Sequence, residues 1–304
     1  MSLNFQKNEL LSKHTYFRIG GPARYFVIPK SIDDLKCVSD FIREKKIPYV
    51  ILGAGSNVLV SDNGFDGLVI STKLLNKEIE VDSSYQGNDT LRFILKIGAS
   101  VLVSRVLNQS ILKGWGGLSF LTGIPGSMGG VTFMNAGTHL GEIEKIIKKV
   151  RIFDLEARES LSDVRDFSSS ELKYSYRKNS YLKPSMVVES IFLEVQEKDS
   201  GFVKSEIEEV LKRRKNSQPL EAPSCGSVFK NPRTDLRAWQ VIDGLGLRGY
   251  QWGGAKFSEK HPNFILNFNE ATAQDVKNLI DLAKKRAKEE RGLVLEEEVR
   301  YIGF

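Results

Sequence analysis

The hydrophobic positions along the chain predict many short strands and a few amphipathic helices. Apolar residues recur every three or four positions in residues 200–213 and 272–291, which is the period of a helix with one buried face. Short apolar runs bounded by polar or turn residues predict strands at residues 49–52, 58–60, 68–71, 92–97, 150–154 and 187–195. Because strands and long helices do not alternate regularly, the pattern favours an α+β fold over a doubly wound parallel sheet.

Capping residues mark the ends of the predicted helices. Ser31, with Asp34 three residues later, has the spacing of a capping box and predicts the start of a helix. Gly114 is expected to end a helix over residues 100–113, and Gly292 one over residues 272–291. Residues 217–223 form a polar, proline-containing segment that predicts a domain boundary.

Composition narrows the class of protein. The chain has 304 residues, 41% of them hydrophobic, so two or three domains with a sizeable core are expected. No apolar run approaches the roughly 18 residues of a membrane helix, and residues 1–13 lack the apolar core of a signal peptide. Cys37 and Cys225 are too few for a disulfide framework or a zinc site, so no metal is expected. These features indicate a cytoplasmic protein.

The net charge of +6 raises the question of nucleic-acid binding. However, basic and acidic residues are mixed, as in KKRAKEER at residues 284–291, which is typical of a solvated helix face. A basic protein that binds anionic small molecules accounts for the charge equally well. We therefore expect no nucleic-acid partner, and the sequence implies no obligate protein partner.

The first glycine-rich segment, GAGSN, comprises Gly53, Ala54, Gly55, Ser56 and Asn57 and follows a predicted strand. A dinucleotide fingerprint would have a third glycine and a helix after it, and both are missing here. Two interpretations remain open: backbone N–H groups that bind phosphate, or a tight hairpin-like turn.

The second glycine-rich segment, GIPGSMGG at residues 123–130, has four glycines in eight residues. Ordering them is unfavourable by very roughly 0.5–1 kcal/mol each relative to alanine in regular structure. A ligand lying against bare backbone would explain their use. An unliganded flexible loop is the alternative, and it fits poorly because Leu121, Ile124 and Met128 are interleaved.

Residues 223–232, PSCGSVFKNP, combine a hydroxyl, a cation and an amide around Gly226, which allows close approach of the backbone to a ligand. Ser227, Lys230 and Asn231 could together act on an anionic, oxygen-rich molecule, and the alternative is a polar turn.

Near the end of the sequence, Glu296 and Glu298 would share one face of an extended strand. Solvent exposure is the alternative for this acidic cluster.

Seven motifs in order resemble the UDP-N-acetylenolpyruvoylglucosamine reductase (MurB) family through nearly the whole chain. They are HTYFRIGGPA at residues 14–23, LGAGSN at 52–57, GIPGSMGG through MNAG at 123–137, YSYRKNS at 174–180, CGSVFKNP at 225–232, GGAKFSEKHPNF at 253–264 and EEEVRYIG at 296–303. Residues 177 and 227 are 50 apart, which resembles the shorter form of the family without an inserted tyrosine-bearing loop.

The resemblance implies a fold, a domain arrangement and a reaction. The fold would be the FAD-binding fold of vanillyl-alcohol oxidase and p-cresol methylhydroxylase, followed by an α+β substrate-binding domain. Residues 1–73 and 74–199 would form two FAD-binding subdomains, residues 200–294 the substrate domain, and residues 295–304 a strand that returns to the first subdomain. Non-covalent FAD, reduced by NADPH, would reduce the enolpyruvyl group of UDP-N-acetylglucosamine enolpyruvate to give UDP-N-acetylmuramate for peptidoglycan synthesis.

The resemblance also assigns roles to residues. Arg177 and Glu298 would polarise the enolpyruvyl carboxylate, and Ser227 would protonate the resulting enol. Substrate would be positioned by Tyr176, Lys230 and Asn231. The residues expected to bind FAD are Gly53, Ala54, Gly55, Ser56, Asn57, Ile124, Pro125, Gly126, Ser127, Gly129, Gly130 and Arg214.

Two segments depart from the family pattern: Thr138-His139 replaces alanine-tyrosine, and residues 236–240 replace an AGxLI pattern. An oxidase of a sugar or hydroxy acid on the same flavin fold is the alternative function. A non-catalytic nucleic-acid binder is a third, and it would carry no flavin.

Overall fold

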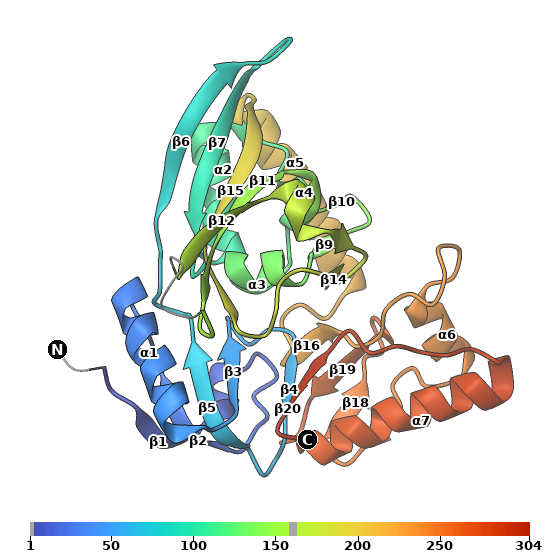
Figure 1. The fold of residues 1–304 in the computed structure, drawn as a ribbon. Coiled ribbons are helices and arrows are strands. Elements are labelled where there is room, and N and C mark those ends of the chain that lie inside the picture. The colour runs from blue at the N-terminus through green and yellow to red at the C-terminus, as the bar shows by residue number, and fades with distance from the viewer. Residues whose placement is uncertain (1–2, 158–162) are drawn as a thin grey trace. The chain divides into compact units, whose positions relative to one another are not determined.

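The computed structural model describes residues 3–157 and 163–304, which form two compact units (Figure 1). The first unit contains the described residues of 1–5, 27–54 and 68–213. The second contains residues 6–26, 55–67 and 214–304. Each unit is therefore assembled from segments that are distant in the sequence. The predicted domain boundaries at residues 73, 199 and 294 stay a prediction.

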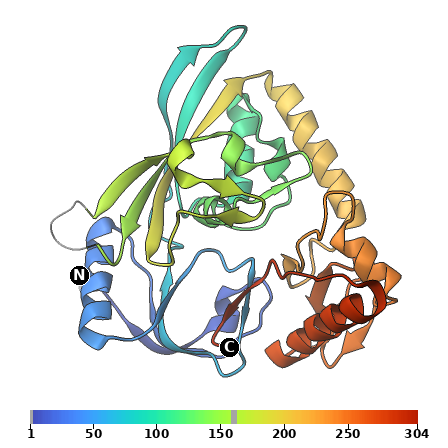
Figure 2. The same cartoon turned by 45° about the vertical axis from the view of Figure 1, so that its right-hand side comes forward.

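An antiparallel sheet dominates the first unit (Figure 2). Its strands, in spatial order, are β12 (Val164–Ser168), β11 (Ile147–Asp154), β15 (Met186–Glu197), β7 (Leu91–Gly98) and β6 (Ile79–Gln86), with β8 (Trp115–Gly116) also paired to β15. Alternate residues such as Leu95, Ile191 and Leu193 are fully buried and share a core with α2 (Val103–Lys113), α3 (Met128–Phe133) and α5 (Ser200–Ser217). The period-2 pattern thus puts one face of the sheet against helices.

Smaller elements complete the first unit. Helix α1 (Ile32–Lys45) begins after Ser31, whose hydroxyl accepts a hydrogen bond from the Asp34 N–H at 3.1 Å. Strand β3 (Tyr49–Leu52) pairs in parallel with residues 68–71 of β5 (Phe65–Ser71). Short elements follow along the chain: η2 (Ser119–Leu121), β9 (Gly137–Thr138), β10 (Gly141–Glu142), η3 (Ile143–Lys145), α4 (Ser169–Leu172), β13 (Tyr174–Ser175) and β14 (Lys178–Asn179).

The second unit is built on an antiparallel sheet of β16 (Ser224–Ser227), β19 (Phe264–Asn267), β18 (Ala255–Phe257) and β17 (Gln251–Trp252), in that order. Buried residues of α6 (Ala238–Gly244) and α7 (Ala273–Arg291) share one apolar cluster with this sheet. Strand β20 (Arg300–Ile302) pairs in parallel with β4 (Val58–Val60). Strands β1 (Gln6–Leu10) and β2 (Pro22–Val27) form an antiparallel pair around η1 (Leu11–His14).

Most predicted elements are confirmed, with three corrections. The strands at 49–52 and 58–60 and the helices near 200–213 and 272–291 are present. The helix predicted from residue 100 begins instead at Val103, because the preceding backbone pairs with another segment: Met128 N–H donates to the Val101 carbonyl at 2.8 Å. A helix, α3, also begins within the second glycine-rich segment, where no helix was predicted.

The third correction concerns residues 53–57, which do not form a hairpin turn. Strand β3 pairs with β5 and strand β4 pairs with β20, so the two strands that flank this segment have other partners.

Among the helices that the structure describes, none combines the length and the apolar character needed to cross a membrane.

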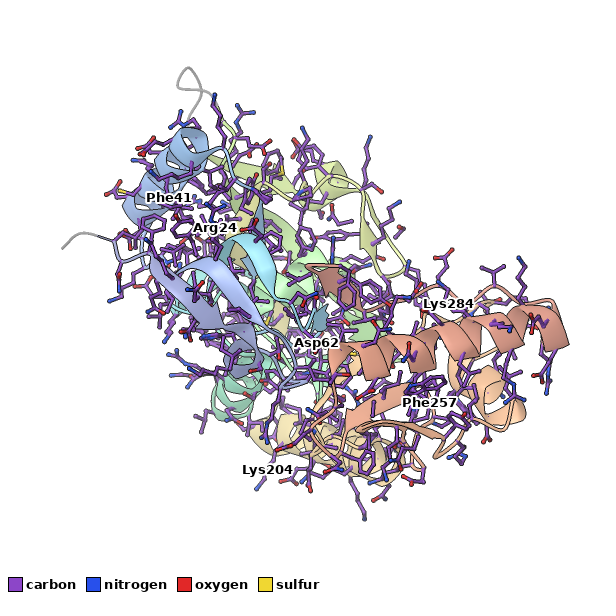
Figure 3. All side chains as sticks on the ribbon, turned by 90° about the horizontal axis from the view of Figure 1, so that it is seen from below. Arg24, Phe41, Asp62, Lys204, Phe257 and Lys284 are labelled. Atoms are coloured by element: carbon purple, nitrogen blue, oxygen red, sulfur yellow. The ribbon has the colours of Figure 1, made fainter. Side chains whose placement is uncertain are left out.

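Three side chains hold the start of α7, and Figure 3 labels one of them, Asp62. Thr272 forms a capping box with Asp275, and the Asp62 carboxylate accepts hydrogen bonds from the N–H groups of Ala273 and Gln274 at 2.8 and 3.1 Å. These contacts satisfy N–H groups that have no partner within the helix. They stabilise the helix that packs behind Phe257 and the rest of the second sheet.

We predict that Thr272→Ala will destabilise the second unit by about 1 kcal/mol, because the cap hydroxyl is lost. The measurement is the urea midpoint of unfolding by far-UV circular dichroism. Glu289→Ala, at an exposed position of the same helix, is the matched control and should leave the midpoint nearly unchanged. Equal midpoints for wild type and Thr272→Ala would show that the cap contributes nothing measurable.

Candidate active site

Gly53 of the first glycine-rich segment lies beside the second glycine-rich segment within the first unit. A β-carbon placed on Gly53 would lie 3.0 Å from Ser127 Oγ and 4.0 Å from the Gly130 α-carbon. The Ser127 hydroxyl is buried and has no hydrogen-bond partner among the described residues. Bare backbone beside an unsatisfied buried hydroxyl is an arrangement that a bound polar ligand would complete.

The glycines at 129 and 130 differ in what they face. A β-carbon on Gly129 would lie 2.9 Å from the Ala99 β-carbon, so close packing within the protein explains this glycine. A β-carbon on Gly130 would meet only Ser127 Oγ, at 3.6 Å, among the described atoms within 4 Å. Protein packing therefore does not require a glycine at 130, whereas close approach of a ligand would.

Backbone pairing fixes this glycine-rich segment. Val103 N–H donates to the Gly126 carbonyl at 3.1 Å, and Gly129 N–H donates to the Ala99 carbonyl at 2.9 Å. Ser127 forms an isolated antiparallel bridge with Leu102. Ile124 and Pro125 precede these contacts, with Pro125 exposed. The segment is thus an ordered part of the first unit, which contradicts the flexible-loop interpretation.

Residues 55–57 belong to the second unit. Gly55 accepts a backbone hydrogen bond from Tyr16 at 2.9 Å, and Ser56 is partly buried. The Asn57 side-chain amide donates to the Glu298 carbonyl at 3.1 Å, and Arg300 N–H donates to the Asn57 carbonyl at 3.1 Å. Asn57 therefore holds the backbone segment that carries Glu298 through two hydrogen bonds.

Ser227 ends strand β16, opposite Phe264 of β19. Gly226, immediately before it, has φ 80°, and a β-carbon there would meet nothing within 4 Å among the described residues. The left-handed backbone favours glycine at this position, and the space beside it is open. Burial raises the pKa of the neighbouring Cys225 thiol to about 12, so this thiol stays protonated at neutral pH. Ser227 is only partly buried.

Asn263 holds the backbone just after Ser227. Its amide oxygen accepts from the Phe229 N–H at 3.0 Å, and its amide nitrogen donates to the Phe229 carbonyl at 2.9 Å. The Asn263 carbonyl also accepts from Val228 N–H at 2.8 Å. Val228 and Phe229 are buried, so these contacts satisfy backbone groups that water does not reach.

The acidic segment lies beside this backbone. Glu297 forms an antiparallel bridge with Phe229, and Glu298 N–H donates to the Val228 carbonyl at 2.7 Å. The Glu297 carboxylate is paired with Lys284 of α7 at 2.8 Å, and Glu296 with Lys230 at 3.2 Å. Glu298 is partly buried, unlike the exposed Glu296. The segments that carry Ser227 and Glu298 are therefore neighbours, and the solvent-exposure interpretation holds for Glu296 but not for Glu298.

Two other predicted residues of the second unit have defined partners. The Asn231 side-chain oxygen accepts from the Ala238 N–H at 3.1 Å, at the start of α6. Arg214 donates from Nε and Nη2 to the Gln218 side-chain oxygen at 3.0 and 2.7 Å. Burial lowers the Arg214 pKa to about 10, which still leaves it protonated at neutral pH. A partly buried cation beside a neutral amide suits an anionic ligand.

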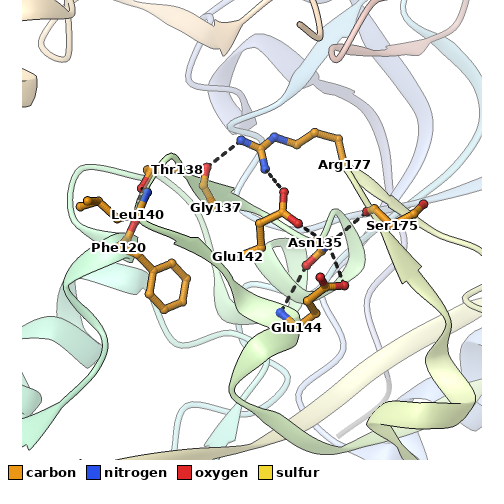
Figure 4. Close-up of polar contacts among 9 residues, drawn as sticks. All are labelled: Phe120, Asn135, Gly137, Thr138, Leu140, Glu142, Glu144, Ser175 and Arg177. Atoms are coloured by element: carbon orange, nitrogen blue, oxygen red, sulfur yellow. Dashed lines mark hydrogen bonds and ion pairs between the residues drawn. The ribbon is translucent and has the colours of Figure 1, made fainter. Parts of the chain in front are cut away.

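Arg177 occupies a two-residue turn between β13 and β14 in the first unit, with φ 54° (Figure 4). Its guanidinium donates to Glu142 at 3.0 Å and to the Gly137 carbonyl at 2.8 Å, and it lies 5.0 Å from the centre of the Tyr176 ring. A positive φ at an arginine is an uncommon, strained conformation of the kind that clusters at functional sites.

Sequence reasoning missed three residues with structural roles at these sites: Asn135, Glu142 and Asn263. Asn135 and Asn263 lie in the motifs MNAG and KHPNF, in which no residue was given a role. A buried asparagine inside such a motif is the signal that could have identified them, because its amide must find partners.

Within residues 3–157 and 163–304, no group of three or more His, Cys, Asp or Glu side chains is arranged to hold a metal ion.

Two family models match different parts of the chain. A family model described as "FAD binding domain" matches residues 23–158. A second, described as "UDP-N-acetylenolpyruvoylglucosamine reductase, C-terminal domain", matches residues 218–302. The buried, unpartnered hydroxyl and open glycine edge lie at Ser127 and Gly130, within the first match, so the residues present fit a bound FAD.

Full-length relatives extend the match. The chain is 38% identical to UDP-N-acetylenolpyruvoylglucosamine reductase of Clostridium novyi (strain NT) over 98% of this chain and 92% of the relative. It is 39% identical to the protein of the same name from Lachnoclostridium phytofermentans, over 97% of this chain and 92% of the relative. The crystal structure of UDP-N-acetylenolpyruvylglucosamine reductase from Thermus caldophilus superposes with a TM-score of 0.80 at 30% identity, over 99% of this chain and 100% of that one.

The predicted fold class is confirmed: a FAD-binding domain of the vanillyl-alcohol oxidase type is followed by the reductase C-terminal domain. The chain belongs to the UDP-N-acetylenolpyruvoylglucosamine reductase family of FAD-binding oxidoreductases, the UDP-N-acetylmuramate dehydrogenases of peptidoglycan precursor synthesis.

Proposed function

We propose that this chain catalyses the NADPH-dependent reduction of UDP-N-acetylglucosamine enolpyruvate to UDP-N-acetylmuramate, with Ser227 as the proton donor. The observation that carries the assignment is the pairing of the Ser227 and Glu298 segments across the Phe229–Glu297 bridge. This pairing sets a hydroxyl and a carboxylate on adjoining backbone that Asn57 and Asn263 hold in place.

The chemistry that bound FAD would supply, after reduction by NADPH, is a hydride for the methylene carbon of the enolpyruvyl double bond. Negative charge then develops on the side of the carboxylate. A guanidinium in a fixed orientation is suited to stabilising this charge, which is the role proposed for Arg177. Glu298 acts with it by polarising the same group.

The remaining step is protonation of the carbon next to the carboxylate, and Ser227 supplies this proton. A serine hydroxyl is a weak acid, but the carbon of an enol-like intermediate is a strong base, so a donor within hydrogen-bond reach suffices. The serine then recovers its proton from solvent. Addition of one hydride and one proton balances the reduction of the double bond.

The other predicted residues bind ligands. We assign FAD contacts to the two glycine-rich segments, namely residues 53–57 and Ile124, Pro125, Gly126, Ser127, Gly129 and Gly130, and we assign Arg214 to the flavin's phosphates. Tyr176, Lys230 and Asn231 position the UDP-sugar. A UDP-linked precursor of peptidoglycan is made in the cytoplasm, which is where we place the protein.

The deciding experiment follows flavin absorbance anaerobically. NADPH should bleach the flavin, and the enolpyruvyl substrate should then restore its colour in the absence of oxygen. The alternative is an oxidase of a sugar or hydroxy acid. In that enzyme the sugar or hydroxy acid would reduce the flavin, and oxygen would be consumed. Failure of the enolpyruvyl substrate to reoxidise the flavin would overturn the proposed function.

We predict that FAD copurifies without a covalent link, because neither glycine-rich segment contains a histidine or cysteine to attach it. Acid precipitation should release the yellow colour into the supernatant, where its absorbance is measured. Colour that stays in the pellet would contradict the prediction.

We predict that Arg177→Ala and Glu298→Gln slow the same half-reaction, because both residues act on the substrate carboxylate. NADPH should still bleach the flavin in both variants, while reoxidation by substrate slows, as stopped-flow absorbance would measure. Glu297→Gln is the control for Glu298→Gln, since Glu297 pairs with Lys284, and it should slow reoxidation less. A variant that lost only the NADPH step would refute the shared role.

We predict that Ser227→Ala slows flavin reoxidation by substrate on the order of 10²–10⁴-fold, the usual effect of losing a general acid. Reduction by NADPH and FAD content should be nearly unchanged, because only one oxygen is removed. Ser224→Ala, on the same strand, is the control and should have a far smaller effect.

Deuterated water gives an independent test of Ser227. The wild-type product should carry solvent deuterium at the carbon next to the carboxylate, because the hydroxyl proton exchanges with water. Reoxidation of Ser227→Ala at close to the wild-type rate would mean that the proton has another source.

A further inference from the structure

We propose that Glu142 is a positioning residue that sets the direction of the Arg177 guanidinium, and that Asn135 fixes Glu142 in turn. This inference rests on the proposed role of Arg177 and adds to it the residues that orient the arginine. All of the residues involved lie in the first unit.

Asn135 is fully buried and adopts a left-handed backbone, φ 46°. Its side-chain nitrogen lies 3.1 Å from Glu142 Oε2, 3.2 Å from Glu144 Oε2 and 3.0 Å from the Ser175 carbonyl. Its side-chain oxygen accepts from the Glu144 N–H at 3.3 Å. Figure 4 shows this amide at the centre of the network.

The two oxygens of Glu142 have different partners. Oε1 accepts from Arg177 Nη1 at 3.0 Å, and Oε2 accepts from the Asn135 amide at 3.1 Å. A carboxylate held at both oxygens has little rotational freedom, so it presents Oε1 to the guanidinium in one direction. Since hydrogen bonds between charged groups are the stronger kind, this contact orients the arginine.

Asn135 also anchors the turn that carries Arg177. The Ser175 carbonyl that accepts from Asn135 belongs to β13, immediately before the turn. Asn135 therefore fixes both the carboxylate that meets the guanidinium and the backbone from which the arginine extends.

The second acceptor of Arg177 is held on the same short hairpin as Glu142. Gly137 and Glu142 face each other in the β9–β10 pair. The Thr138 hydroxyl donates to the Phe120 carbonyl at 3.3 Å and accepts from the Leu140 N–H at 3.2 Å, which ties the hairpin to its surroundings. The departure from the family pattern at residue 138 thus lies in the support of this hairpin, outside the contacts to Arg177.

Charge gives the network a pH dependence. Burial raises the pKa of Glu142 above its ordinary value, the Glu144 carboxylate also raises it, and Arg177, Asn135 and Lys145 oppose the shift. Glu142 is ionised above this raised pKa and becomes protonated as the pH falls through it. Protonation removes the negative charge that faces Arg177, so orientation of the arginine should weaken on the acid side.

The test is Glu142→Gln, which keeps the size of the side chain and removes its charge. We expect flavin reoxidation by the enolpyruvyl substrate to slow about 10- to 100-fold, the range for losing one hydrogen bond to a charged group. Reduction by NADPH, FAD content and thermal midpoint should stay near wild type. Calorimetric titration of the oxidised protein with the UDP-sugar product gives a readout without turnover, and its affinity should fall as well.

Three variants make the outcome decisive. Glu144→Gln touches Asn135 but not Arg177, so it should keep most of the reoxidation rate. Glu142→Asp keeps the charge and should restore part of the rate lost in Glu142→Gln. It also tests the role of the charge if Glu142→Gln folds poorly. In Glu142→Gln, the acid-side fall in reoxidation rate that is due to Glu142 should disappear, whereas a purely structural role would leave the pH profile unmoved.

Each result bears on a different claim. Wild-type reoxidation in Glu142→Gln, with slow reoxidation in Arg177→Ala, would overturn the positioning role and leave the proposed function intact. Wild-type reoxidation in both would overturn the role of Arg177 itself. Equal slowing of both half-reactions, or equal loss of rate in Glu144→Gln and Glu142→Gln, would show general damage to the fold instead of positioning.

Discussion

The paired hydrogen bonds between the Asn263 amide and the Phe229 backbone are the contact on which the second unit's candidate site depends. A buried peptide group must have partners, and here one side chain satisfies both the N–H and the carbonyl. With Phe229 held, its neighbour Val228 can accept from Glu298, and Ser227 remains at the end of the sheet. Removing the amide would leave buried polar groups unpaired, which is more unfavourable than never forming the bond.

The first unit uses the same device at Asn135. Its buried amide faces two carboxylates and a carbonyl, more acceptors than its two N–H groups can fully satisfy. The arrangement is tolerable because Arg177 neutralises one carboxylate, Glu142. In both units, therefore, a buried asparagine determines where a charged or hydroxyl side chain lies, although the asparagine takes no part in the chemistry.

Glycine occupies positions in these segments for two different physical reasons. Gly129 is required by close packing on Ala99. A β-carbon on Gly130 would meet only Ser127 Oγ, at 3.6 Å, and one on Gly226 would meet nothing within 4 Å among the described residues. Backbone hydrogen bonds to residues 99–103 hold residues 126–129 of the second glycine-rich segment in place. A site already ordered loses less entropy on binding than a loop that must fold around its ligand.

Local pattern in the sequence was sufficient for the regular elements and for the family. The period of apolar residues predicted the long helices, Ser31 and Gly292 marked helix ends, and the ordered motifs indicated the reductase family. These features depend on residues close together in the chain, where spacing alone decides the outcome.

Only the tertiary structure decided what distant residues do to one another. Residues 100–102 have a helical pattern but pair with residues 126–128, because a backbone partner from outside the segment overrides local preference. The partner of Arg177 could not be read from the chain, since Glu142 lies 35 residues away and is chosen by the folding of two hairpins. Likewise, a motif can indicate that Asn135 matters, but its three acceptors are brought together only by packing, which depends on the whole unit and not on any one segment.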